Sequence, residues 1–206
     1  MGDEIVLNYQ NSLLRKSDVD LLHGSQWLND QIIGFWFEYL ENCCGCQTVC
    51  FVSPEVAQLM KLGFPADIST FIETLNLSSK TFVFLPINDS VSLEQPGGSH
   101  WSLLIYEKSS TTFFHLDSLG KSNSNQAKRI AKNLNLSKRE PIELNCLQQE
   151  NSWDCGVFVC SHADHVINHC LKDRKELSSL PILDKQIVSQ QRSHMLQTIT
   201  RLSLQK

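Results

Sequence analysis

The sequence predicts an α+β domain with a sheet in the middle of the chain and helices around it. Apolar runs of strand length gather in the central part of the chain, and segments with apolar residues at helical spacing lie before and after them. The composition, 41% hydrophobic and 19% charged over 206 residues, is that of a globular chain able to bury a core. No internal repeat or Pro/Gly-rich linker divides the chain, so we expect residues 1–206 to form one domain.

The first expected elements are a helix and a strand. Residues 27–41 carry apolar side chains at helical spacing, and Asn29 or Asp30 stands near the start, where helices favour such residues. Residues 82–87 form a short apolar run suited to a buried strand, and a polar loop over 88–99 follows it. This loop contains Pro96, Gly97 and Gly98.

The remaining elements complete the sheet and its flanking helices. Two more strands are expected at 101–106 and 112–116, because apolar runs there are separated by a turn-like segment. A helix is expected at 123–136, where small and apolar residues share one side. A fourth strand, a buried helix and a terminal amphipathic helix are expected at 142–147, 156–170 and 183–202.

Charge and hydropathy exclude two classes of function. The formal net charge is −4 and no basic stripe compensates locally, which argues against a nucleic-acid-binding surface. No apolar run approaches the roughly 18 residues that a membrane-spanning helix needs, and no apolar stretch near residue 1 marks a signal peptide. We therefore expect a soluble protein of the cytoplasm or nucleus without membrane partners.

The eight cysteines are expected to be reduced, because intracellular thiols stay reduced. Four of them crowd together as Cys43, Cys44, Cys46 and Cys50. Only the first and third have C-x-x-C spacing and no second pair exists, so a reduced, variable loop is favoured over structural zinc.

Three histidines in the helix expected at 156–170 raise a second metal hypothesis. His162, His165 and His169 share roughly one face, but the sequence supplies no obvious carboxylate partner from another element. A solvated helix face is favoured over a metal site. We expect neither a metal nor a cofactor.

Cys155 is the candidate nucleophile. A thiol attacks carbonyl groups as thiolate, which a helix N-terminus and a neighbouring imidazolium both stabilise. Cys155 follows a polar turn and precedes an apolar helical run, and Gly156 leaves space beside it. The alternative is a small buried hydrophobe, which suits Cys160 and Cys170 inside the helix better than Cys155.

His100 is the candidate base and Asp117 the residue that orients it. His100 lies where the Gly-Gly loop meets a strand, so its side chain can face a cleft while its backbone is held. Asp117 closes the next strand, and a carboxylate there would favour the charged imidazole if the two strands are neighbours. On its own, Asp117 is equally well interpreted as an aspartate that initiates a turn.

Gln149 is the candidate donor to the oxyanion. It follows the strand expected at 142–147, and a glutamine there can aim its amide at a carbonyl under attack, beside the backbone N–H of Cys155. Composition alone does not separate Gln149 from Gln148.

In combination, these segments resemble the cysteine proteases of ubiquitin-like modifiers, the sentrin-specific and deneddylase group. The matching segments are Trp27-Leu28-Asn29-Asp30 with Ile33, Gly98-Ser99-His100-Trp101, residues 114–118, and Gln149 through Asn151 to Asp154-Cys155-Gly156. The resemblance implies a papain-like fold with the permuted order His-Asp-Cys and a central, mostly antiparallel sheet flanked by helices. Trp153 and Leu116 stand where the family pattern leads us to expect an aromatic such as tyrosine, and the cysteine cluster has no counterpart in it.

The resemblance also implies a substrate-binding channel. Trp27 and Trp101 match two tryptophans that roof a narrow channel for a Gly-Gly tail, where flat indoles leave no volume for a β-carbon. Asp30 matches a position that helps to hold the tail. Without the resemblance, core packing would be preferred for both tryptophans, and a favourable charge in a first helical turn for Asp30.

The expected function is cleavage after the C-terminal Gly-Gly of a ubiquitin-like modifier, by one catalytic protease domain that acts as a monomer. The fit at 6–22 and 53–56 resembles the compact deneddylase branch, which implies the neddylation modifier, as precursor or as lysine conjugate. A sentrin (SUMO)-type modifier is the alternative. A non-catalytic module that binds Gly-Gly tails and an acyltransferase stay open as other classes. We expect the loop over 88–99 to close on the bound tail.

Overall fold

A five-stranded sheet forms the centre of the computed structural model, which describes residues 2–95 and 97–205. Its strands run in the order β3 (Val49–Phe51), β4 (Phe82–Asn88), β5 (Trp101–Glu107), β6 (Thr112–Leu116) and β7 (Ile142–Glu143). The long central pairs β4–β5 and β5–β6 are antiparallel, whereas the short edge strands β3 and β7 pair in parallel with their neighbours. The expected α+β fold with a mostly antiparallel sheet is confirmed.

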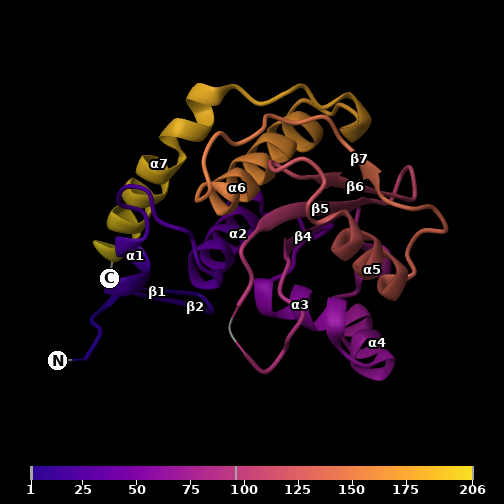
Figure 1. The fold of residues 1–206 in the computed structure, drawn as a ribbon, viewed down its shortest axis with the longest axis horizontal. Helices are drawn as coiled ribbons and strands as arrows, with labels where there is room; N and C mark the ends of the chain where they lie inside the picture. The colour runs from indigo at the N-terminus through magenta and orange to yellow at the C-terminus, as the bar shows by residue number, and fades with distance from the viewer. Residues whose placement is uncertain (1, 96, 206) are drawn as a thin grey trace.

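Helices cover both faces of this sheet (Figure 1). On one face lie α2 (Asp30–Cys44) and α6 (Cys155–Val166), and α7 (Lys185–Ser203) extends this layer. On the other face lie α3 (Pro54–Leu62), α4 (Pro65–Thr74) and α5 (Ser124–Leu134). Along each strand, successive side chains alternate between the two cores: Phe84 packs on the α2 side and Val83 on the α3 side. Burial on both faces explains why β4 and β5 are almost continuously apolar.

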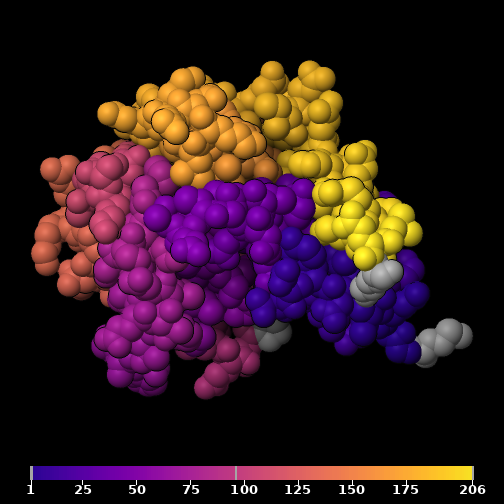
Figure 2. Space-filling view, turned by 180° about the vertical axis from the view of Figure 1, so that it is seen from behind, coloured from indigo at the N-terminus to yellow at the C-terminus, as the bar shows by residue number. Residues whose placement is uncertain are grey.

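The two ends of the described chain lie side by side. An N-terminal hairpin of β1 (Ile5–Tyr9) and β2 (Ser12–Arg15) leads into the short helix α1 (Lys16–Asp20). The hairpin packs against α7, and the space-filling view shows the N-terminal segment beside the C-terminal helix (Figure 2). None of the helices in residues 2–95 and 97–205 combines the length and apolar character that a membrane crossing needs.

Local signals explain where the helix expected at 27–41 begins and ends. Asn29 caps α2, because its Oδ1 accepts the N–H of Ile32, so the helix starts at Asp30. Gly45 ends it in the left-handed conformation at φ 57°. The three residues from Trp27 therefore stay outside the helix, where they are free to line a cleft.

Two other expected elements differ from the structure. Only Ile142–Glu143 of the strand expected at 142–147 is regular, although the chain still follows β6 through bonds such as Gln149 N to Ser118 O at 2.8 Å. The helix expected at 156–170 begins one residue earlier, at Cys155, and changes after Val166 into a π-helical segment, Ile167–Lys172.

Several elements have no counterpart in the sequence-based expectations: the N-terminal hairpin, α1, β3, α3, α4 and two short 3-10 turns at Leu77–Ser79 and Leu177–Ser179. Each is at most ten residues long, so its own hydrophobic pattern carries little signal. Tertiary contacts with the sheet decide their conformation.

The expected solvated histidine face on α6 is wrong. His162 is 2% exposed and His169 is 6% exposed. His169 Nε2 contacts Glu176 O at 3.0 Å, and His165 Nε2 contacts Pro181 O at 2.8 Å. The segment between α6 and α7 therefore covers these rings. In the part of the chain that the structure describes, no group of three His, Cys, Asp or Glu side chains is placed to hold a metal.

The cysteine cluster is not a variable loop either. Cys43 and Cys44 belong to the last turn of α2, Cys46 follows its glycine cap, and Cys50 is buried in β3. All eight cysteines are free thiols. The cluster reflects a tight helix-to-strand connection at one end of α2.

Candidate active site

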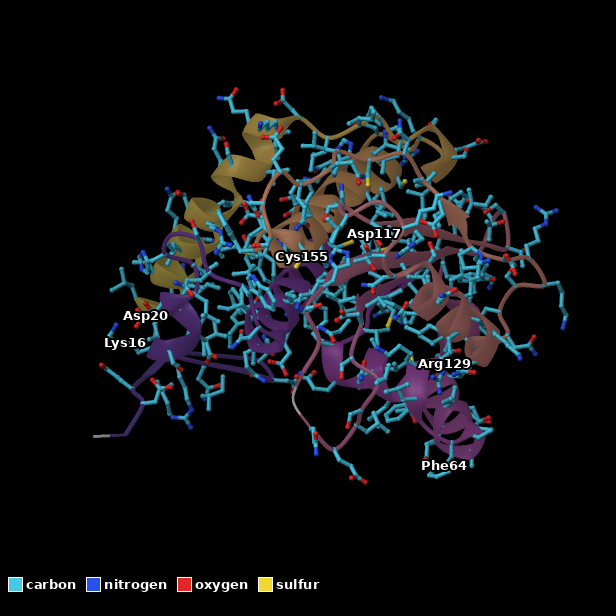
Figure 3. The ribbon with its side chains drawn as sticks, in the orientation of Figure 1. Lys16, Asp20, Phe64, Asp117, Arg129 and Cys155 are labelled. Atoms are coloured by element: carbon cyan, nitrogen blue, oxygen red, sulfur yellow. The ribbon has the colours of Figure 1, made fainter. Side chains whose placement is uncertain are left out.

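The sheet brings His100 and Asp117 together. His100 immediately precedes β5 and Asp117 immediately follows β6, and the antiparallel register pairs Leu103 with Leu116. The two side chains therefore meet at one end of neighbouring strands, with His100 Nε2 2.6 Å from Asp117 Oδ1. Both side chains are buried, at 5% and 0% exposure. Figure 3 shows Asp117 at the same end of the sheet as Cys155.

Backbone groups fix the Asp117 carboxylate. Oδ1 also accepts the N–H of Leu119 at 2.9 Å, and Oδ2 accepts the N–H of Asn123 at 2.8 Å. Burial by itself raises the pKa of Asp117, but the bonds from His100 and from the two backbone amides outweigh it and lower that pKa. The carboxylate is therefore ionised at neutral pH and faces the imidazole as an anion.

The environment of His100 favours its charged form. Burial is the largest single influence and lowers the pKa of His100, but the hydrogen bond to the Asp117 carboxylate, with its negative charge, and the nearby Cys155 raise it to about 9. Since Nε2 faces Asp117, Nδ1 is the ring atom left for other partners. At neutral pH an imidazolium lies between a carboxylate and a sulfur.

Cys155 is the first residue of α6 and is 3% exposed. Because the residue begins the helix, its side chain lies next to the partial positive charge of the helix N-terminus. A β-carbon at Gly156 would lie 2.9 Å from Leu28 Cβ, so the glycine allows α6 to begin against the segment that carries Trp27. The space that Gly156 provides is therefore filled by Leu28, and it is not left free as the sequence suggested.

Asn151 organises the turn in front of Cys155. Its Oδ1 accepts the N–H groups of Trp153 and Asp154, at 3.1 and 3.0 Å. Its Nδ2 donates to the Asp154 carboxylate at 2.8 Å. One side chain thus closes the polar turn and fixes the residue that precedes the sulfur.

Arg192, on α7, binds the same turn. Its Nε and one Nη donate to Asp154 Oδ1 at 3.2 and 2.8 Å, and its Nη groups also donate to Leu21 O at 2.7 Å and Gln26 O at 2.6 Å. The C-terminal helix is thereby tied to the residue before Cys155 and to the residue before Trp27. Arg192 was not predicted as a site residue, because nothing in the sequence of an amphipathic helix indicates which distant residues its arginine contacts.

The two adjacent glutamines have different surroundings. Gln149 lines a cavity together with His100; its Oε1 accepts from Ser118 Oγ at 2.8 Å and its Nε2 donates to Asn151 O at 2.6 Å. These bonds orient the amide and leave its second N–H available. Gln148 instead accepts from Gly120 N at 2.6 Å and donates to Asp117 O at 3.1 Å, so it braces the turn after β6.

Trp27, Asp30 and Trp101 line one cavity of about 810 Å³, with Gly97 and Gly98 on its wall. Trp27 is 47% exposed, which is inconsistent with core packing, while Trp101 is half-buried against the core. Asp30 lies in the first turn of α2, where its Oδ1 also accepts the N–H of Gln31. The three residues expected to bind a tail therefore face a common space.

The loop between β4 and β5 is held at its base. Asp89 accepts the N–H groups of Ser99 and His100, at 2.6 and 3.1 Å. Lys61 Nζ donates to Asn88 O and to Ser90 O, the latter at 2.7 Å. The loop thus positions the backbone of His100. Pro96 lies outside the described residues, and closure of the loop over a tail stays a prediction.

A second imidazole-carboxylate pair lies inside the core. His115 Nδ1 is 2.8 Å from Glu143 Oε2, and its Nε2 is 2.9 Å from Ser102 Oγ. His115 is fully buried, at 0% exposure, so no substrate reaches the ring. This pair links β5, β6 and β7 and does not compete with His100 as a candidate base.

Comparison with known proteins agrees with this geometry. A family model described as "Ulp1 protease family, C-terminal catalytic domain" matches residues 26–199. Sentrin-specific protease 8 of Mus musculus is 42% identical over 212 residues, which cover 98% of this chain and 95% of the relative. NEDD8-specific protease 1 of Arabidopsis thaliana is 34% identical over 168 residues, covering 78% of this chain and 74% of the relative.

Solved structures show the same fold. The C-terminal Ulp1 protease domain in complex with Smt3, the yeast ortholog of SUMO, superimposes with a TM-score of 0.73 at 22% identity, covering 99% of this chain and 90% of that chain. A structure of the SUMO protease Ulp1 with its catalytic cysteine oxidised to a sulfinic acid gives a TM-score of 0.75, covering 98% and 90%. The chain therefore belongs to the Ulp1 protease family and is a cysteine peptidase.

Proposed function

We propose that this peptidase cleaves after the C-terminal Gly-Gly of the neddylation modifier NEDD8, both in its precursor and in its lysine conjugates. The observation that carries the proposal is the buried pair of Asp117 and His100 at one end of the sheet, with Cys155 at the start of α6 and a neighbouring cavity that has two tryptophans on its wall. We assign Cys155 as nucleophile, His100 as general base and acid, Asp117 as the orienting carboxylate and Gln149 as oxyanion donor.

The first half of the reaction forms a thioester. The Cys155 thiolate bonds to the carbonyl carbon of the terminal glycine, and the electron pair of the C=O bond moves to its oxygen. The second N–H of Gln149 and the backbone N–H of Cys155 stabilise this oxyanion. The His100 imidazolium then gives its proton to the departing nitrogen as the C–N bond breaks.

The second half of the reaction releases the modifier. Neutral His100 takes a proton from water, and the oxygen attacks the thioester carbon. Collapse of the second tetrahedral intermediate breaks the C–S bond and returns the sulfur as thiolate, while the modifier leaves as a carboxylic acid that loses its proton to solvent. His100 gives one proton to the departing amine and recovers one from water, so the cycle balances without a metal or organic cofactor.

The tail is held by the cavity of Trp27 and Trp101. Two flat indoles and the glycines of the adjacent loop leave room for an extended backbone without β-carbons, which selects Gly-Gly by exclusion. Asp30 offers a carboxylate to the amides of the tail. The name of the Arabidopsis relative, NEDD8-specific protease 1, supports NEDD8 as the modifier.

A panel of modifiers with C-terminal thiol-reactive electrophiles tests the choice of modifier. NEDD8, SUMO and ubiquitin probes are offered at equal concentration, and the rate of covalent labelling is followed by intact mass. We expect NEDD8 to label first and Cys155→Ala to abolish both labelling and processing. Processing that survives in Cys155→Ala would mean that the nucleophile is misassigned, whereas binding without processing by the unmodified chain would indicate a non-catalytic module.

A SUMO-type modifier is the second candidate, supported by the fold shared with Ulp1 in complex with Smt3. Preferential labelling by the SUMO probe would favour it. An acyltransferase is the third candidate, and it would be revealed by an acetyl-thioester on Cys155 after incubation with acetyl-coenzyme A.

We further propose that residues 1–206 act as one catalytic domain, as a monomer, in the cytoplasm or nucleus. The single pair of cores on either side of one sheet supports the first statement. Light scattering coupled to size exclusion measures the second, and imaging of a tagged chain in cells measures the third.

A further inference from the structure

A second cavity, of about 490 Å³, lies beside the first. Trp27 lines both cavities, whereas His100 and Gln149 line only the second. The first cavity holds the other tryptophan, the loop glycines and Asp30. Trp27 thus separates a space suited to a peptide tail from a space that opens onto the imidazole.

The proposed function gives these two spaces a direction, and the inference rests on it. If the Gly-Gly tail occupies the first cavity, the scissile carbonyl lies at the boundary, next to Cys155. The nitrogen that leaves must then lie near His100, because this imidazolium protonates it. His100 lines the second cavity, so the group attached to that nitrogen extends into it.

The second cavity offers two apolar surfaces. Leu119 is 48% exposed and Trp27 is 47% exposed, so both present apolar surface to the cavity that they line. The backbone of Leu119 is fixed, because its N–H binds the Asp117 carboxylate that also holds His100. A chain of methylene groups between leucine and indole would be removed from water on both sides.

The charge at the rim is negative. Glu150 is the only charged side chain apart from His100 on the lining, and no lysine or arginine contributes to it. Glu150 pairs with Lys185 at 2.6 Å, but their side chains are 75% and 69% exposed, so solvent weakens this pair. A cationic group on a substrate can therefore replace Lys185 as the partner of Glu150.

We propose that this cavity is the leaving-group subsite and that it is built for the acceptor lysine of a conjugated protein, with basic residues beside that lysine. The four methylenes of the lysine lie between Trp27 and Leu119, and Glu150 binds a neighbouring lysine or arginine of the conjugated protein. Leu119 and Glu150 thereby determine specificity on the departing side without taking part in the chemistry.

The test compares substrates that share one modifier and differ only in what leaves. Two are isopeptide conjugates to the lysine of a short peptide, flanked either by arginines or by glutamates. The third is the modifier with a C-terminal propargylamide, which labels the cysteine without releasing an amine. Variants Leu119→Ala and Glu150→Lys are matched by Leu204→Ala and Glu140→Lys, since Leu204 is exposed and Glu140 sits in an exposed pair with Lys128, and neither lines a cavity.

We expect Leu119→Ala to lower kcat/KM on both isopeptides by about fivefold or more, which corresponds to roughly one kilocalorie per mole of lost contact. Glu150→Lys should lower the ratio of kcat/KM between the arginine- and glutamate-flanked peptides by about tenfold, because the rim charge is inverted. Labelling by the propargylamide and both control variants should stay within about twofold of the unmodified chain.

Two results would overturn the subsite and can be told apart from failure of the proposed function. Unchanged isopeptide kinetics with normal propargylamide labelling would remove Leu119 and Glu150 from leaving-group recognition but leave the protease assignment intact. An equal fall in labelling and in isopeptide cleavage would show that the variants act on the tail or on the sulfur. If the unmodified chain is not labelled by any modifier probe, the proposed function itself fails.

Discussion

At the scale of single residues, several hydrogen bonds of the site meet at the Asp117 carboxylate. Its carboxylate receives the ring of His100 and the backbone N–H groups of Leu119 and Asn123. The sequence left two interpretations of this aspartate, a turn residue or a partner for an imidazole. Both describe what the carboxylate does, because the turn that begins at Asp117 presents its amides to the same carboxylate that holds His100.

Asp117→Asn should lower kcat by about 10²–10⁴ at a temperature where the variant is folded. The amide keeps the size of the side chain but removes the negative charge that favours imidazolium, so the alkaline limb of the kcat/KM profile should move to lower pH. Steady-state kinetics from pH 6 to 10 measure both effects.

The control for this prediction is Asp164→Asn. Asp164 is a partly buried carboxylate that accepts from Trp36 Nε1 and Gln191 Nε2, both at 2.9 Å, and lines neither cavity. Its loss should lower the melting temperature more than the rate. Equal rate losses in the two variants would contradict the role assigned to Asp117.

The neighbouring glutamines provide an internal comparison. Gln149→Ala should lower kcat by about 10²–10³, because one oxyanion donor is lost. Gln148→Ala should mainly lower stability, by about 1–3 kcal/mol, because Gly120 N and Asp117 O lose their partner. Kinetics and thermal unfolding of both variants separate the two roles; a larger rate loss in Gln148→Ala would reverse the assignment.

At the scale of elements, long apolar patterns were predictable and short elements were not. The expected strand at 112–116 agrees with β6, and the expected strand at 101–106 is only one residue shorter than β5. α3 and α4 were missed, although both start with a proline, because each is at most ten residues long and the face that it covers is defined only by the folded sheet. The burial of His162 and His169 was missed because it depends on tertiary packing, and His169 also contacts Glu176 O in the segment that follows the helix.

Arg192 links elements that are far apart in the sequence. Arg192→Ala should destabilise the fold by about 2–4 kcal/mol, because it removes the donor to Leu21 O and Gln26 O and to Oδ1 of the half-buried Asp154 carboxylate. It should also lower kcat and raise KM together, since the segments of Cys155 and Trp27 both lose their tie. Arg192→Lys should recover little, because an ammonium group does not span the three acceptors.

Arg201→Ala is the matched control for Arg192. Arg201 lies on the same helix and donates to Tyr39 OH at 3.1 Å. This contact is exposed and does not involve the turn before Cys155. Its removal should change stability by less than about 0.5 kcal/mol and leave the kinetics unchanged. If Arg192→Ala loses stability but keeps both kcat and KM at a temperature where it is folded, the arginine only supports the fold.

At the scale of the whole molecule, the site joins five stretches of chain: residues 27–30, His100, Asp117, residues 149–155 and Arg192. The sheet brings His100 to Asp117, and α2, α6 and α7 bring the others to the same end. The adjacency of the two chain ends therefore contributes directly to the site, because α7 holds the turn before Cys155 (Figure 1).

Folding stability should depend on the protonation of His100. Its pKa is raised from 6.5 to about 9, so between these pH values the folded chain keeps a proton that the unfolded chain releases. This contribution, up to about 3 kcal/mol, is fully present below the unfolded pKa and is lost as pH rises through about 9. Urea unfolding from pH 6 to 9.5 measures the loss.

His100→Gln isolates this term. Burial lowers the pKa of Lys61 to about 8. The contribution of Lys61 to folding stability therefore changes with pH in the opposite direction to that of His100, because it rises as pH increases above about 8. The difference between the unmodified chain and His100→Gln cancels the lysine contribution. A difference that stays constant with pH would show that the imidazole is not held in its charged form by the fold.

The sequence by itself determined the types of residue and the order of the elements: strand, histidine, strand, aspartate, turn, cysteine, helix. These are local properties, because hydrophobic period, capping residues and polar turns depend on neighbours within a few positions. Only the tertiary structure decided the distance of 2.6 Å between His100 and Asp117, the different surroundings of Gln149 and Gln148, the contact of Gly156 with Leu28 and the tie through Arg192. These features depend on contacts between residues up to 171 positions apart in the sequence. Such contacts form only when both cores assemble together, so no local sequence pattern predicts them.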